Sequence, residues 1–212
     1  MRNLSDGVFA IVLTLLVLNL NIPGLADIDS NAELARELLH RTPILVGYLV
    51  SFVAVGMYWM VHTRIVRRII HPSRKLLSRN LVFLFWLSLV PFTTTLSTGT
   101  QGVPLAWAIY SANMVMLGIS VVAIWSKAVV MRCVDSHVTP LYGRYIALRG
   151  WTVVAVFATS VPLAFLNIRI AQASLLAIPL AAYFIRRHLR PHLVVEFAHL
   201  QETDAASGPI PL

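Results

Sequence analysis

Cysteine and charged residues are both scarce in this chain of 212 residues. Cys133 is the single cysteine, which excludes an intrachain disulfide and a zinc site built from several cysteines. Only 12% of the residues are Asp, Glu, Lys or Arg, whereas 58% are apolar and the mean hydropathy is +0.75. This composition excludes an ordinary soluble domain and is typical of an integral membrane protein, whose first partner is the lipid bilayer.

Acidic residues are fewer than basic ones, at nine against seventeen, and the formal net charge is +8. A positive charge of this size also occurs in proteins that bind nucleic acid. In this chain, however, the Lys and Arg residues lie at the edges of long apolar runs, where they suit loops that face anionic lipid. We therefore expect no nucleic-acid partner.

Whole stretches without charge are long enough to cross a bilayer. Residues 7–26 carry no charge, and a helix of that length spans about 30 Å. The uncharged stretch 80–126 is too long for one span, and its turn-rich residues 97–104 divide it. We predict an all-α integral membrane fold with six transmembrane helices, at about residues 4–22, 43–63, 80–96, 105–130, 145–168 and 171–185.

The connections are also predictable. Pro23 and Gly24 are typical of a helix end, and residues 31–41 are expected to form a short surface helix with Ser30 as its N-cap. Pro91 and Pro162 lie inside predicted spans, where we expect each of them to kink its helix. We predict one membrane domain of six helices over residues 1–190 and a flexible cytoplasmic tail over residues 191–212.

The Lys and Arg residues predict the orientation of the six spans. With the N-terminus inside, three cations lie outside and fourteen lie inside. The outer cations are Arg36, Arg41 and Arg169; the inner ones include Arg2, the group from Arg64 to Arg79, Lys127, Arg132, Arg144, Arg149, Arg186, Arg187 and Arg190. We therefore expect a multi-pass protein of a bacterial plasma membrane with both termini cytoplasmic.

The first predicted helix carries an apolar stripe. Ile11, Leu15 and Leu18 lie at positions i, i+4 and i+7, with Thr14 and Asn21 close to the same face. Such a stripe is most often a packing seam between helices. Asp6 stands at the start of the same helix, and a carboxylate beside a membrane span is costly to desolvate, which makes it a candidate functional residue.

A second set of polar residues marks the inner end of the second span, at Trp59 and His62. Taken singly, Trp59 is typical of an interfacial aromatic and His62 of an interhelical hydrogen bond. Because the inner ends of spans one and two share a membrane level, Ser5, Asp6, Trp59 and His62 are predicted to form one polar network; a water-accessible proton site is the alternative. No Gly-x-Ser-x-Gly nucleophile elbow occurs, and we expect no enzyme activity.

The segment Ser5-Asp6-Gly-Val-Phe-Ala-Ile11, followed by Thr14-Leu-Leu-Val-Leu18, resembles the first helix of bacterial potassium channels related to lysosomal transmembrane protein 175. That family's signature is Arg-x-x-x-Phe-Ser-Asp. In this chain Leu4 stands at the position of the Phe, and Arg2 lies two residues closer to Ser5 than the arginine of the signature does. The family also has Trp-x-x-His, which is matched by Trp59 and His62.

The resemblance implies a homotetramer in which the first helix of each subunit lines a central pore. Position by position, Ile11 corresponds to the narrow apolar constriction, Leu15 and Leu18 to further apolar rings, and Thr14 to a polar ring that favours potassium. An apolar ring narrower than a hydrated ion imposes a desolvation barrier. The polar network would support the pore helix from behind. The expected function is passive, potassium-preferring cation conduction, with no cofactor and no metal other than the permeant potassium.

Two alternatives remain. A small secondary transporter or proton-coupled exchanger requires ionisable residues at the middle of the membrane, and we expect none in the spans apart from Asp6 and His62 near the inner face. A non-conducting membrane scaffold is the other alternative. The chain has no Thr-Val-Gly-Tyr-Gly filter loop, so potassium selectivity should be weaker than in channels that have one.

Overall fold

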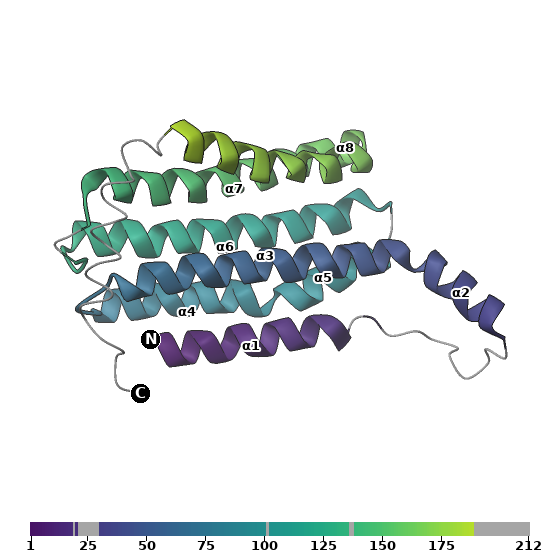
Figure 1. The fold of residues 1–212 in the computed structure, drawn as a ribbon, viewed down its shortest axis with the longest axis horizontal. Helices are drawn as coiled ribbons and strands as arrows, with labels where there is room; N and C mark the ends of the chain where they lie inside the picture. The colour runs from purple at the N-terminus through teal and green to yellow at the C-terminus, as the bar shows by residue number, and fades with distance from the viewer. Residues whose placement is uncertain (19, 21–29, 101, 136–137, 189–212) are drawn as a thin grey trace.

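The computed structural model describes residues 1–18, 20, 30–100, 102–135 and 138–188, and within these ranges the chain is almost wholly α-helical. Figure 1 shows the long helices lying side by side, with α1 at one edge of the bundle and α8 at the opposite edge. The named helices are α1 (Arg2–Leu18), α2 (Asn31–His40), α3 (Thr42–Arg67), α4 (Arg74–Ser88), α5 (Val90–Gly99), α6 (Pro104–Val130), α7 (Pro140–Leu166) and α8 (Ile168–Ala173). A 3-10 turn, Ser174–Leu176, leads from α8 into a further helix over residues 177–188.

Five helical segments among the described residues are long and apolar enough to cross a membrane: Thr42–Arg67, Arg74–Gly99, Pro104–Val130, Leu141–Leu166 and Ile168–His188. They correspond to predicted spans two to six. The first helix, α1, has 17 described residues, which is about 26 Å of helix. Asn21, Pro23, Gly24 and the predicted tail 191–212 lie outside the described residues, as does the predicted end of the first helix at Ile22.

Local sequence signals explain where the helices begin. The Ser30 side chain accepts a hydrogen bond from the Glu33 amide at 3.2 Å, which confirms the predicted N-cap of the short connector helix α2. Helices α3, α6 and α7 each have proline in their first turn, where the missing amide hydrogen costs nothing. Asn167 is the one residue between α7 and α8, and its side chain caps α8 by accepting from the Arg169 amide at 2.9 Å.

The two internal prolines behave differently. The third span is broken into α4 and α5 at Leu89, two residues before Pro91. Proline lacks an amide hydrogen and its ring crowds the carbonyl four residues back, which explains why the helix is interrupted here and not only kinked as the sequence predicted. Pro162, by contrast, lies inside α7, which continues to Leu166.

The fifth span begins earlier than the sequence predicted. Thr139 caps α7 by accepting from the Tyr142 amide, and the helix starts at Pro140 rather than at residue 145. Arg144 therefore lies within this helix rather than in the connection before it, and Arg149, which the predicted range 145–168 already included, lies further along the helix. The predicted start is too late because Arg144 lowers the local hydropathy. Arg149 lies about 13 Å along α7, so the expectation that only Asp6 and His62 are ionisable within the spans is wrong.

Helix α6 is the centre of the bundle. It contacts α4 and α5 on one side and α7 on the other, and 61% of its most apolar 18-residue stretch is buried. In the other four long apolar helices the buried share of the corresponding stretch is 39% or less, so most of their apolar surface is left uncovered by the described chain. Helix α1 packs against α3, α4 and α5, on the opposite side of α6 from α7.

Candidate functional site: the first helix and the polar cluster behind it

Helix α1 has one buried face and one exposed face. Ser5, Phe9, Val12 and Leu16 are buried against the bundle at a spacing of four, three and four residues. The opposite face is apolar yet open: Ile11 is 58% exposed and Leu18 is 69% exposed. In a single chain, therefore, the side of α1 away from the bundle has no covering element among the described residues.

We call this open face the α1 stripe and define it as Leu4, Gly7, Ile11, Thr14, Leu15 and Leu18, all of which are exposed. Five of the six follow one another at intervals of three, four, three and four residues. This is the heptad spacing by which helices pack along a shared seam. All four residues that the sequence analysis assigned to the pore, Ile11, Thr14, Leu15 and Leu18, lie on the α1 stripe.

Thr14 has a defined side-chain conformation. Its hydroxyl donates a hydrogen bond to the backbone carbonyl of Ile11 at 2.8 Å. Because a hydroxyl has one hydrogen and two lone pairs, this bond leaves the oxygen's lone pairs turned away from its own helix. Thr14 therefore presents an acceptor on an otherwise apolar face.

A buried polar cluster, formed by Ser5, His62 and Asn80, lies directly behind this helix. His62 Nε2 is 2.8 Å from Asn80 Oδ1, and Asn80 Nδ2 donates to Ser5 Oγ at 3.0 Å. The Ser5 hydroxyl in turn donates to the Met1 carbonyl at 3.0 Å. All three side chains are buried, with exposed fractions of 2% or less. One direction of donation, from His62 to Asn80 to Ser5 to the backbone, satisfies the whole chain of bonds.

Aromatic rings enclose the imidazole of His62. Phe83 stacks on it with centroids 4.9 Å apart and an interplanar angle of 9°, and Phe9 lies at 5.7 Å in a tilted arrangement. Phe9 comes from α1, His62 from α3 and Phe83 from α4, so the cluster joins the three helices at one end of the bundle. The orientation of α1 relative to α3 and α4 is thereby held by both hydrogen bonds and ring packing.

Asp6 and Trp59 form a separate pair at the same end. The indole Nε1 of Trp59 donates to Asp6 Oδ1 at 3.0 Å, and Trp59 is 43% exposed. The four residues that were predicted to form one network are therefore arranged as two. Asp6 bonds to Trp59 near the surface, and Ser5 reaches His62 only through Asn80.

Asn80 is the residue that the sequence analysis missed. It bonds to both Ser5 and His62, so it is the link between α1 and α3. The available signal was its position: an amide side chain at the first uncharged residue after Arg79, at the inner end of the third predicted span. Among the described residues, no group of three or more His, Cys, Asp or Glu side chains is placed to hold a metal ion.

The N-terminal part of the chain matches a known family. Residues 1–91 match the family model described as endosomal/lysosomal potassium channel TMEM175. This range includes α1, α3 and α4, and with them the α1 stripe and the whole buried polar cluster.

Two bacterial proteins with the name potassium channel are similar in sequence. The one from Streptomyces collinus is 31% identical over 125 residues, which is 57% of this chain and 59% of that protein. The one from a Chryseobacterium species is 33% identical over 129 residues, or 61% of this chain and 62% of that protein. The matched stretch thus spans about three fifths of these relatives' own length. A Bos taurus protein named endosomal/lysosomal proton channel TMEM175 is 26% identical over 97% of this chain and 46% of its own length.

Two solved structures share the fold. A lysosomal potassium-selective channel TMEM175 homolog from Chamaesiphon minutus aligns with a TM-score of 0.72 at 22% identity, over 88% of this chain and 94% of that one. The potassium channel MtTMEM175 aligns with a TM-score of 0.59 at 14% identity, over 95% of this chain and 92% of that one. The resemblance carried by Ser5, Asp6, Trp59 and His62 is thereby confirmed as a similarity: residues 1–91 match the model of the endosomal/lysosomal potassium channel TMEM175 family.

Proposed function

We propose that this chain is one subunit of a tetrameric, passive, potassium-preferring cation channel in a bacterial plasma membrane. Each subunit has six membrane-spanning helices, namely α1 and the five long apolar segments, and both termini are cytoplasmic. The α1 stripe of each subunit faces the central axis. The names of the bacterial relatives support channel activity, and the fold they share with this chain is the expected scaffold.

The single observation that carries the proposal is the exposure of the α1 stripe. Lipid can cover an apolar face, as it can on the other spans, but the α1 stripe also has the heptad spacing by which helices associate along a seam, and it carries the Thr14 acceptor. One helix cannot enclose a pore, so copies of α1 must meet around an axis, and identical subunits do this with cyclic symmetry. Four copies follow from the family resemblance.

Within that assembly, Ile11 forms the constriction. Four branched side chains at one level make an apolar ring that a hydrated ion must shed water to pass. Thr14, one turn further along, supplies hydroxyl oxygens that replace part of the lost hydration shell. Potassium is held less tightly by water than sodium, so partial replacement favours potassium. Leu15 and Leu18 continue the apolar wall.

The buried polar cluster keeps the pore helix in place. Its hydrogen bonds join the inner end of α1 to α3 and α4, while the α1 stripe on the other side stays free to face the axis. A rigid attachment is needed because the width of a constriction formed by one side chain from each of four subunits changes with small rotations of each helix. Trp59 and Asp6 add a second attachment nearer the surface.

Recording from the purified protein in a planar bilayer tests the proposal. We expect cation currents whose reversal potential shifts toward the potassium equilibrium potential when potassium and sodium are placed on opposite sides. A voltage-independent absence of current from tetramers that are intact by size and mass would refute conduction. A transporter would show a flux coupled to a second gradient instead of a passive unit current.

Proton conduction is the second candidate, because the Bos taurus relative that aligns over 97% of this chain is named a proton channel. The α1 stripe contains no titratable side chain, so protons would have to pass along water. One measurement distinguishes proton conduction from potassium conduction. With equal potassium on both sides, a pH gradient moves the reversal potential of a proton channel and leaves that of a potassium channel near zero.

A further inference from the structure

Arg149 lies well inside the long helix α7 and lines a pocket. It stands nine residues after the start of α7, about 13 Å along the helix. Its guanidinium donates to the Tyr145 hydroxyl at 3.2 Å and lies 5.7 Å from the centre of that ring. Among the described residues, no carboxylate lies within salt-bridge distance of Arg149. A permanent cation is thus held at membrane depth with only neutral partners.

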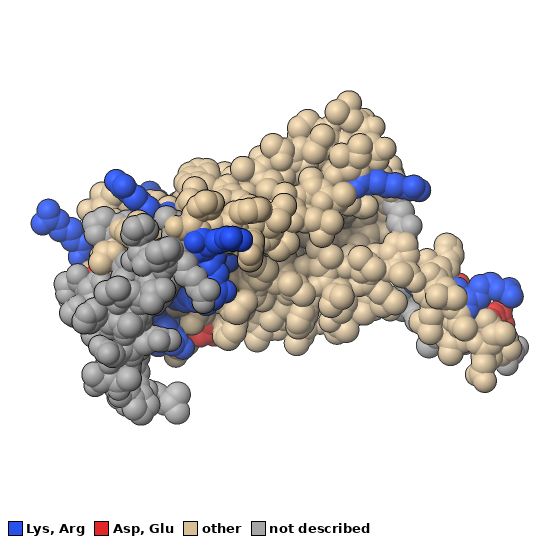
Figure 2. Space-filling model, turned by 45° about the horizontal axis from the view of Figure 1, so that its top comes forward, with Lys and Arg blue, Asp and Glu red and all other residues tan. Residues whose placement is uncertain are grey.

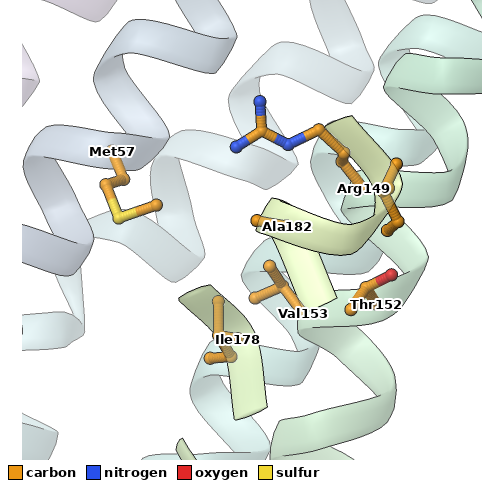
Figure 3. Close-up of a pocket in the computed structure, with 7 residues that line it drawn as sticks. Met57, Arg149, Thr152, Val153, Ile178 and Ala182 are labelled. Atoms are coloured by element: carbon orange, nitrogen blue, oxygen red, sulfur yellow. The ribbon is translucent and has the colours of Figure 1, made fainter. Parts of the chain in front are cut away.

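The pocket beside Arg149 is apolar and opens between three helices. It has a volume of about 30 Å³ and is lined by Met57 of α3, Val153 of α7, and Ile178, Ala182 and Ile185 of the helix 177–188. Figure 3 shows the arginine side chain extending across the top of this pocket toward the side on which Met57 lies, with Ala182 below the guanidinium. The site therefore combines one positively charged group with a wall of apolar side chains.

The charges around the pocket continue the same pattern. Arg186 and Arg187 follow Ile185 directly and are exposed. Since α7 begins and the helix 177–188 ends at the same end of the bundle, these arginines and Arg149 lie on the side that carries the N-terminus of α1. Most cations on the face shown in Figure 2 gather at that end. Anionic lipid concentrates on the side of a bacterial membrane where basic residues gather.

We propose that Arg149 and this pocket bind one anionic phospholipid of that leaflet. The guanidinium forms a bidentate pair with the lipid phosphate, and one acyl chain lies against Val153, Ile178 and Ala182. An arginine matches phosphate because its planar fork offers two parallel N–H donors. Its long side chain, directed back toward Tyr145, allows the charge to reach the headgroup level while the backbone stays in the hydrocarbon. Pockets of this kind between transmembrane helices suit acidic headgroups.

The location of the pocket keeps it open to lipid. Helix 177–188 and α7 lie at the opposite edge of the bundle from α1. When the α1 stripes of several subunits meet at a central axis, the pocket faces outward; this step rests on the proposed assembly. Lipid binding can be measured without any ion current, so the failure of either proposal is visible separately.

Native mass spectrometry of the delipidated full-length protein tests the site. Phosphatidylglycerol and phosphatidylcholine with the same acyl chains are the probes, and inorganic phosphate is the competitor. We expect the wild type to bind phosphatidylglycerol about tenfold more tightly than phosphatidylcholine. Arg149→Gln should remove this preference, whereas Arg149→Lys should keep part of it. Arg144→Gln is the matched control, because Arg144 is exposed on the same helix and does not line the pocket.

The acyl-chain part is tested by Ala182→Trp, which fills the pocket and leaves the arginine in place. This substitution should weaken the binding of both lipids severalfold. Equal binding by Arg149→Gln and Arg144→Gln would overturn the proposal, as would equal affinity of the wild type for the two lipids. Displacement of the lipid by millimolar inorganic phosphate would assign the site to a free anion instead. Should Arg149→Gln fail to yield folded protein, Arg149→Lys and Ala182→Trp decide the question.

Discussion

His62 and Asn80 are joined across two helices by a bond of 2.8 Å between Nε2 and Oδ1, and the same asparagine holds Ser5 of the first helix. One amide therefore links α1, α3 and α4 at a depth where water does not compete. Replacing Asn80 with Ala leaves two buried polar groups without their partner, at a cost of about 1–3 kcal/mol each. We expect a lower melting temperature and a smaller fraction of tetramer for Asn80→Ala.

The matched control for Asn80→Ala is Ser78→Ala. Ser78 is exposed on the same helix, and its hydroxyl donates a hydrogen bond to the backbone carbonyl of Arg74, one turn earlier in that helix. Thermal unfolding monitored by circular dichroism, together with size-exclusion chromatography, compares the two variants. Equal melting temperatures and equal tetramer yields would show that the buried polar cluster does not hold α1 in place.

Gly118 is predicted to be indispensable for the packing of α6. A Cβ at this position would lie 2.7 Å from Val154 Cγ2 and 3.2 Å from the Tyr58 hydroxyl. Gly118→Val should therefore force α6, α7 and α3 apart and destabilise the subunit by about 1–3 kcal/mol. Gly56→Val is the control, because nothing lies within 4 Å of a Cβ there. Urea titration of both proteins measures the difference, and similar midpoints would contradict the packing.

The topology can be read with single cysteines on a Cys133→Ser background. The turn between α3 and α4 is predicted to be cytoplasmic and the turn between α5 and α6 to be outside. A membrane-impermeant maleimide applied to intact cells should label Thr100→Cys and should label His71→Cys only after the membrane is opened. Both chosen residues are exposed, so access to solvent is matched. The reverse pattern would invert the orientation.

Thr14 should influence which cation passes. Its hydroxyl hydrogen is used by the Ile11 carbonyl, so its oxygen offers lone pairs to an ion. Thr14→Ala should lower the potassium preference severalfold while conduction persists, and Thr14→Ser, which keeps the hydroxyl, should retain most of it. Reversal potentials under a potassium–sodium gradient measure both variants. If the serine variant lost as much potassium preference as the alanine variant, the Thr14 hydroxyl would not be the source of that preference.

The parts of the structure that were predictable are those encoded by local pattern. Ser30 as a cap, Pro91 as a distortion of its helix, and the stripe of Ile11, Thr14, Leu15 and Leu18 each follow from neighbouring residues in one helix. The role of Asn80 could not be predicted, because its partners are 75 and 18 residues away and their approach depends on how three helices pack. Arg149 lies within the predicted range of the fifth span but was overlooked as an ionisable residue there, because hydropathy alone does not register an arginine that reaches back toward the interface.

The proposed function requires that the α1 stripe lines an ion pathway and is not only a packing seam between helices. Ile11→Asn and Val17→Asn make the comparison, because both residues are exposed on α1, at 58% and 47%, while Val17 lies about 120° away around the helix from Ile11. A polar side chain in an apolar constriction admits water and lowers the barrier to an ion.

Single-channel recording of both variants as purified tetramers is the most direct measurement. We expect a larger unit current or a higher open probability for Ile11→Asn and a wild-type current for Val17→Asn. Wild-type current and wild-type selectivity in Ile11→Asn, with the tetramer intact, would contradict this expectation and would assign the α1 stripe to packing alone.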